Sequence, residues 1–242
     1  MKTWRLDHQE IVEIAPMKEC WAALDFARKA EKTEQGLVLL IGDPGTGKTV
    51  NTRLYEREQG ESVVHLSVPA AELIEAGRLL SLLAAGLHTC ADFRSPFTLA
   101  RYLIRESFGQ PRMIILDNAQ AIASRKWLDV IRWLNDESAH TFVLAGTPSL
   151  EGIFAEHLEF AGRVLLRHRL RRPTAEEISP LFEGFPEAVI AKVHEEGEGR
   201  MREIMALRRW LTQLVAQKKI DIDELAPKQV SMVARHFLMR VA

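Results

Sequence analysis

The segment of this sequence best suited to chemistry is the octapeptide Gly42-Asp43-Pro44-Gly45-Thr46-Gly47-Lys48-Thr49. It matches the phosphate-binding pattern G-x-x-x-x-G-K-[ST] at each fixed position. Glycines at these places let the backbone turn tightly and direct its N–H groups at phosphate oxygens, and the start of a following helix adds partial positive charge. Lys48 is then expected to reach the β- and γ-phosphates of a nucleotide, and the Thr49 hydroxyl to bind Mg²⁺.

A carboxylate on a second strand is the other half of such a site. The apolar run Met113-Ile114-Ile115-Leu116 ends in Asp117, which we expect to hold Mg²⁺ directly or through water. Many ATPases of this type place a glutamate next, but here the residue is Asn118, and Gln120 follows two positions later. An amide orients water but takes up no proton. We therefore expect slow hydrolysis, which an Asn118→Glu variant is expected to speed.

Thr147 is a third candidate, because it ends a predicted strand in the run Ala145-Gly146-Thr147-Pro148. Its hydroxyl is suited to a hydrogen bond with the γ-phosphate or with the attacking water. It is equally suited to capping a helix that begins at Pro148, and the two roles are compatible.

The elements that position these residues alternate between strand and helix. This alternation predicts an α/β fold with a parallel sheet and helices on both faces. Continuous or alternating apolar residues predict the strands at 37–41, 63–66, 113–116, 141–145 and 163–170. Helical spacing predicts helices at 17–32, 50–59, 70–87, 97–108 and 124–135, with Ser95-Pro96 capping the fourth.

The pattern changes after Arg171-Arg172-Pro173. A capping box, Thr174-Ala175-Glu176-Glu177, opens a helix, and only helices are predicted beyond it, at about 186–195, 202–217 and 228–240. The chain is therefore expected to comprise an α/β nucleotide-binding domain at 1–172, including its N-terminal helix, and a small helical lid at 173–242.

Composition sets broad limits. The 242 residues carry a formal net charge of −1, with 47% hydrophobic and 27% charged residues, as in ordinary globular proteins. A net charge near zero gives no overall positive field of the kind that favours nucleic-acid binding, so such binding would need a local basic patch. The two cysteines have no metal-binding spacing, and no apolar run is long enough to cross a membrane. A cytoplasmic protein without a membrane partner is expected.

In their order along the chain, these motifs resemble those of AAA+ ATPases. They are the phosphate loop, Ile114–Gln120, Val143–Pro148 and the lid motif Gly199-Arg200-x-x-Glu203-Ile204. Over about residues 35–240 the chain is more narrowly similar to the DNA-transposition ATPases, namely the phage Mu B protein, TnsC and TniB. The match includes Val50 after the phosphate loop, so the residues expected to bind nucleotide run from Gly42 to Val50.

This resemblance implies roles for arginines and for DNA. ATP and Mg²⁺ are expected between subunits of a ring or helical filament on duplex DNA, which recruits or stimulates a transposase. Arg163, before the last strand, matches the arginine that reaches a neighbouring subunit's γ-phosphate. Arg200 and Arg202 both suit the lid's sensor position. The resemblance also implies a DNA-backbone contact at the start of the helix before the Asp117 strand, with Arg94, Ser95, Thr98 and Arg101.

Two other functions fit the same motifs. A helicase loader or replication-initiation ATPase shares these parts, and origin-binding ATPases of the archaeal type do so as well. A nucleotide-gated scaffold or signalling protein without DNA binding agrees with the near-neutral charge. The sequence also lacks room before the phosphate loop for the helix-turn-helix module of the Mu B protein, so any DNA contact is expected in the core or the lid.

Overall fold

A computed structural model describes residues 2–6, 9–30, 36–69, 76–88, 95–122, 125–217 and 220–237. Contacts between residues divide the chain into two compact units. One comprises 20–43 and 48–170, and the other comprises 1–19, 44–47 and 171–242.

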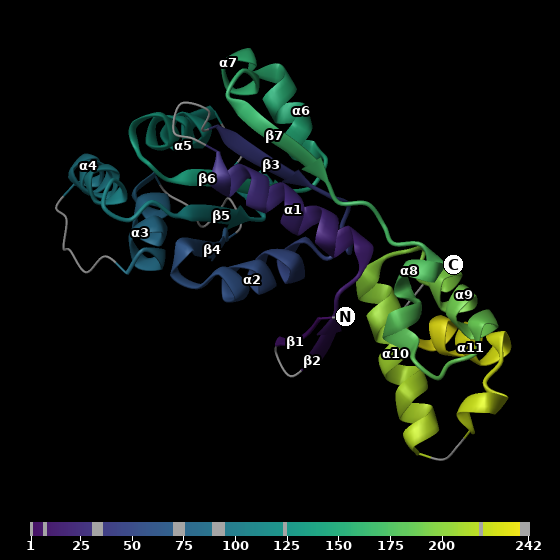
Figure 1. The fold of residues 1–242 in the computed structure, drawn as a ribbon. Coiled ribbons are helices and arrows are strands. Elements are labelled where there is room, and N and C mark those ends of the chain that lie inside the picture. Colours follow the sequence, from purple (N-terminus) through teal and green to yellow (C-terminus); the bar gives the residue numbers. More distant parts are fainter. Residues whose placement is uncertain are drawn as a thin grey trace. The chain divides into compact units, whose positions relative to one another are not determined.

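The larger unit is built on a five-stranded sheet in the order β4-β5-β6-β3-β7 (Figure 1). The strands are β3 (Leu37–Ile41), β4 (Val63–Ser67), β5 (Met113–Asp117), β6 (Thr141–Gly146) and β7 (Val164–Arg169). Each neighbouring pair is parallel, which confirms the predicted α/β fold with a parallel sheet. Because parallel strands point the same way, their carboxyl ends meet at one edge, where Asp117 and the start of the phosphate loop lie.

Helices cover both faces of this sheet, as predicted. Alternate strand residues divide between two clusters: Leu37 and Leu39 pack on one face, and Val38 and Leu40 on the other. The second face is covered by α1 (Ala15–Lys29, from Cys20 onward) and α2 (Lys48–Gln59). Helices on the first face are α3 (Ala76–Gly86), α4 (Pro96–Ser107), α5 (Arg125–Glu137), α6 (Ser149–Glu156) and α7 (Leu158–Ala161).

The other unit is helical over the described residues that follow 170. Its helices are α8 (Ala175–Ile178), α9 (Glu187–Glu196), α10 (Met201–Ala216) and α11 (Pro227–Phe237). The predicted capping box is confirmed, since the Thr174 hydroxyl accepts from the Glu177 N–H and the Glu177 carboxylate accepts from the Thr174 N–H. Buried side chains from α9, α10 and α11 form its core, among them Val189, Val193, Ile204, Leu207 and Val230.

An N-terminal hairpin was not among the predicted elements. Strands β1 (Thr3–Leu6) and β2 (Gln9–Val12) pair antiparallel, with Thr3 opposite Val12. Each strand has only four residues and mixes polar with apolar positions, so neither produces a clear periodic signal. Among the described residues, no helix is long and apolar enough to cross a membrane.

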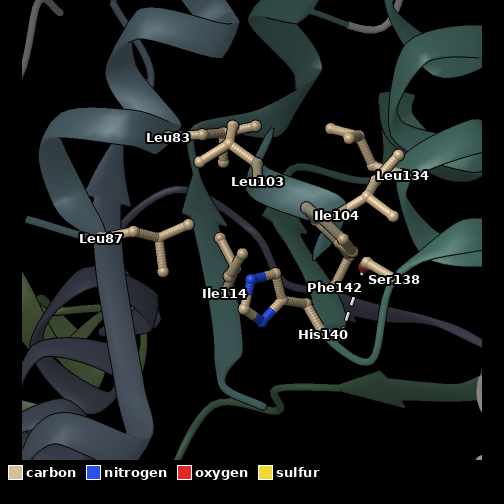
Figure 2. A pocket seen from close by; sticks show the side chains of 9 residues that line it. All are labelled: Leu83, Leu87, Leu103, Ile104, Ile114, Leu134, Ser138, His140 and Phe142. Carbon is tan, nitrogen blue, oxygen red and sulfur yellow. Dashed lines mark hydrogen bonds between the residues drawn. The ribbon is translucent and has the colours of Figure 1, made fainter. Parts of the chain in front are cut away.

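A small cavity of about 10 Å³ lies among helices α3, α4 and α5 and strands β5 and β6 (Figure 2). Leucine, isoleucine and phenylalanine side chains form most of its wall, with Ser138 and His140 at one side. This volume is close to the space of a single water molecule, so the cavity is a packing gap and holds no nucleotide.

His140 is the titratable group at this cavity, and it is 4% exposed. Its Nδ1 accepts a hydrogen bond from the Arg112 backbone N–H at 3.1 Å. Burial, followed by the positive charge of Arg112, lowers the pKa of His140 to about 4. The imidazole is therefore neutral at pH 7, where it serves as a hydrogen-bond acceptor.

We expect His140 to make the protein less stable in mild acid. The unfolded chain takes up this proton near pH 6.5, but the folded chain takes it up only near pH 4, so the free energy of unfolding falls as the pH drops between those values. The loss is about 3 kcal/mol at most. Denaturant titrations from pH 7 to pH 4 measure it.

The control is His140→Asn, whose side-chain oxygen can still accept from Arg112 but does not titrate. We expect its stability to fall less steeply with acid than that of the parent. Equal slopes for the two proteins would contradict the role given to His140.

A candidate nucleotide site at the carboxyl edge of the sheet

The phosphate loop has the backbone that its sequence predicts. Gly45 and Gly47 have φ angles of +84° and +90°, which other residues adopt only with strain. The Lys48 ammonium donates to the carbonyl oxygens of Gly42 and Asp43 at 2.5 and 3.0 Å. These bonds hold the lysine charge over the start of the loop. Val50, in the first turn of α2, is 37% exposed.

Thr49 and Asp117 are brought together although 68 positions separate them in the chain. The Thr49 hydroxyl donates to Asp117 Oδ2 at 2.6 Å. A hydroxyl and a carboxylate oxygen are hard ligands of the kind that Mg²⁺ accepts alongside phosphate and water oxygens. The described residues hold no cluster of three or more acidic, histidine or cysteine side chains for a metal. Thr49 and Asp117 supply two such oxygens, and these suit a Mg²⁺ ion whose other ligands come from phosphate and water.

His65 is a neighbour of Asp117 that the sequence analysis missed. It lies on β4, and its Nε2 is 3.6 Å from Asp117 Oδ2, with both side chains almost fully buried. Burial alone would raise the pKa of Asp117. The neighbouring His65 imidazole and the hydrogen bonds from the Thr49 hydroxyl and the Asn118 N–H outweigh burial and hold the pKa of Asp117 below its usual value. A polar residue inside a predicted buried strand was the available signal.

Asn118 has a local structural reason to be asparagine. Its φ is +65°, a left-handed conformation that asparagine tolerates better than most residues. Its Nδ2 donates to the Val68 carbonyl oxygen at 3.2 Å, and its Oδ1 accepts from Gln120 Nε2. An amide has two N–H groups and two acceptor positions, so these bonds leave one of each for water.

Thr147 follows β6 at the same edge as Asp117. Its N–H donates to Gln120 Oε1 at 3.3 Å, and its hydroxyl shares a hydrogen bond with Ser149 Oγ at 2.7 Å. The residue before helix α6 is Pro148, and no side chain caps that helix. The Gly42 N–H donates to the Gly146 carbonyl at 3.1 Å, so the phosphate loop and Thr147 flank one peptide.

Arg163 lies at the opposite edge of the sheet. Its carbonyl accepts from the Leu37 N–H, at the amino end of β3, whereas the phosphate loop follows the carboxyl end. A five-residue strand separates the two by about 16 Å. Arg163 Nε donates to both oxygens of Asp136 at 2.9 Å. Arg163 therefore lies about a strand length from the phosphate loop of the same chain.

The two lid arginines differ in their contacts within the unit that includes residues 44–47. The Arg200 side chain packs against Gly45, where an added Cβ would lie 3.3 Å from Arg200 Cβ, and its guanidinium pairs with Glu198 at 2.8 Å. Arg202 contacts Gly45 through its backbone N–H at 3.4 Å, and its side chain is exposed.

The candidate DNA contact lies at the start of α4. Ser95 caps this helix as predicted, since its hydroxyl accepts from the Thr98 N–H at 3.2 Å, and Pro96 is the first helical residue. The Ser95 and Thr98 hydroxyls also bond each other at 2.9 Å, and Arg101 is exposed. Arg94 lies outside the described residues.

Comparison with known proteins identifies the fold of this site. The family model described as "AAA domain" matches residues 30–154. Aeropyrum pernix ORC2 in ADPNP–ADP complexes has a TM-score of 0.71 at 12% identity, with 93% of this chain and 68% of that chain covered. A. pernix ORC1 in complex with DNA has a TM-score of 0.64 at 18% identity, with 97% of this chain and 68% of that chain covered. Cdc6p from Pyrobaculum aerophilum has a TM-score of 0.62 at 15% identity, with 93% of this chain and 67% of that chain covered.

These likenesses show an AAA+ P-loop core, as the motifs predicted. They do not support the narrower resemblance to transposition ATPases, since the three structures are ORC and Cdc6 proteins. No curated protein sequence matches the chain.

The geometry of Asn118 predicts that Asn118→Glu destabilises the protein. A glutamate there would have to adopt the left-handed backbone conformation and could not donate to the Val68 carbonyl, so we expect the free energy of unfolding to fall by about 1–3 kcal/mol. Thermal unfolding measures it. Asn118→Gly relaxes the backbone but also removes the bond, and so separates the two effects. A glutamate variant as stable as the parent would show that neither feature matters.

Proposed function

The chain belongs to the AAA domain family, and from that premise we propose that it is an ATPase that binds ATP with Mg²⁺ and assembles on duplex DNA. The observation that carries this proposal is the hydrogen bond between Thr49 and Asp117 at 2.6 Å. It joins the two oxygen ligands that a magnesium–nucleotide complex needs, next to a loop with a lysine and two left-handed glycines. When bound, the metal supplies charge neutralisation at the β- and γ-phosphates.

We assign hydrolysis to the same edge of the sheet. Lys48 would contact the phosphates, Asn118 would orient the attacking water, and Thr147 would lie near the γ-phosphate. Because Asn118 cannot accept a proton, turnover within one subunit should be slow.

Self-association is part of this proposal. Arg163 cannot reach the nucleotide of its own subunit, so a neighbour's phosphate is its natural partner. Its pair with Asp136 is exposed, and such pairs contribute about 0–1 kcal/mol, so the guanidinium can leave the carboxylate at little cost. A bidentate guanidinium would then offset charge at a γ-phosphate. Arg200 is our choice for the lid's sensor arginine because its side chain packs on Gly45.

Among DNA-binding ATPases, we favour the replication-initiation type over the transposition regulator. This choice rests on the fold likeness to ORC and Cdc6 proteins, one of them in complex with DNA. The start of α4 is the proposed DNA surface, with Ser95, Thr98 and Arg101 directed at phosphates. With a formal net charge of −1 and no group assigned to base edges, binding should be salt-sensitive and largely independent of sequence.

Assembly on DNA is expected to require ATP. Mixing the protein with labelled duplex should give large complexes with ATP–Mg²⁺, smaller ones with ADP, and progressive loss as salt is raised. Lys48→Ala should bind nucleotide weakly and should not assemble. Analytical ultracentrifugation measures the size of the complexes that the parent and the Lys48→Ala variant form. Assembly that ignores nucleotide would remove the phosphate-loop argument, and assembly without DNA binding would favour a scaffold.

Arg163→Ala is expected to separate binding from hydrolysis. ATP affinity should stay near that of the parent, but the rise in specific activity with protein concentration should disappear, a loss of up to about 10³-fold. Arg167→Ala, which removes an exposed arginine from β7, the strand that follows Arg163, is the control. If Arg163→Ala weakens ATP binding and folding together, Arg163 has a structural role instead.

A further inference from the structure

A chain of side-chain amides ties the carboxyl ends of three strands together. Asn118 Nδ2 donates to the carbonyl of Val68, which follows β4, at 3.2 Å. Asn118 Oδ1 accepts from Gln120 Nε2, and Gln120 Oε1 accepts from the N–H of Thr147, after β6, at 3.3 Å. Gln120 is thus the middle link between the residue that follows Asp117 and the residue expected near the γ-phosphate.

The backbone at Gly146 accommodates this glutamine. A Cβ at Gly146 would lie 2.8 Å from Gln120 Oε1, closer than two such atoms approach. The same glycine accepts the Gly42 N–H through its carbonyl at 3.1 Å. Gln120 therefore lies against the peptide that the phosphate loop also binds, and a side chain at Gly146 would displace it.

Glutamine is the residue type that this position needs. Its amide donates to Asn118 and accepts from Thr147 at the same time. Glutamate has the same shape but no N–H group, so its oxygen would face Asn118 Oδ1. Turning the Asn118 amide around would only move the clash of acceptors to the Val68 carbonyl.

We propose that Gln120 is a positioning residue that fixes Asn118 and Thr147 relative to each other. Contact of Thr147 with the γ-phosphate is then coupled to the orientation of water by Asn118. This inference rests on the proposed ATPase function. Gln120 touches neither nucleotide nor metal in this role, so it should affect turnover more than ATP binding.

The test compares Gln120→Leu, which removes both bonds, with Gln120→Glu, which keeps the acceptor for Thr147. We expect kcat to fall about ten- to a hundredfold in Gln120→Leu and less in Gln120→Glu, because misplacement by about 1 Å costs that much in rate. KM for ATP should stay within about twofold, since ground-state binding is preserved. Equilibrium titrations should show an ATP affinity close to that of the parent in both variants.

Gln213→Leu, at an exposed position on α10, is the matched control and should behave as the parent. If the parent hydrolyses ATP and both Gln120 variants match it in kcat, the inference fails and the proposed function stands. A lower kcat, a higher KM and a lower melting temperature together would also overturn it, because that pattern marks a purely structural residue. If Gln120→Leu does not fold, the isosteric Gln120→Glu decides. A parent that binds no ATP would overturn the proposed function and this inference with it.

Discussion

The hydrogen bond between Thr49 and Asp117 depends on parallel pairing across three strands. Asp117 ends β5, and the phosphate loop follows β3, with β6 between them. The register places Asp117 opposite Ala145, and Ile41 opposite Gly146, so the three strands end within one residue of each other. A shift of β5 by one residue against β6 would turn Asp117 to the other face and separate it from Thr49. The buried apolar residues that fix the register are therefore as necessary to the site as its polar groups.

Much of this arrangement could be predicted from the sequence, because it has a strong local signal. Continuous apolar runs gave β3, β5 and β6, and the glycine pattern gave the loop between β3 and α2. Contacts between side chains on different strands could not be predicted, because the spacing of residues along the chain does not specify how the strands align with each other. His65 reaches Asp117, and Gln120 reaches Thr147, only once β4, β5 and β6 are aligned. The β1–β2 hairpin was not predicted for another reason: a strand of four residues has too few positions to show a periodic pattern of apolar residues.

Asn118 shows how a local backbone requirement and chemistry meet at one position. From the sequence alone, asparagine in place of glutamate indicates the loss of a proton acceptor. In the structure, the left-handed backbone and the donor bond to Val68 both favour asparagine, and neither suits glutamate. The same amide still has a free N–H and a free acceptor position for water. Under the proposed function, asparagine here would take up no proton but would still orient water, so the bound nucleotide would persist until another subunit acted on it.

The proposed self-association is argued from the two edges of the sheet. The phosphate loop, Asp117 and Thr147 gather at the carboxyl edge, and Arg163 lies at the amino edge beside Leu37. Since a strand length separates them, one subunit alone cannot bring the arginine to its own phosphate. Asp136 meanwhile keeps the guanidinium extended and paired by bonds of 2.9 Å, where it remains exposed to a partner. Under the proposed function, a single sheet would offer a nucleotide at one edge and a guanidinium at the other, so stacking of like subunits would depend on the bound nucleotide.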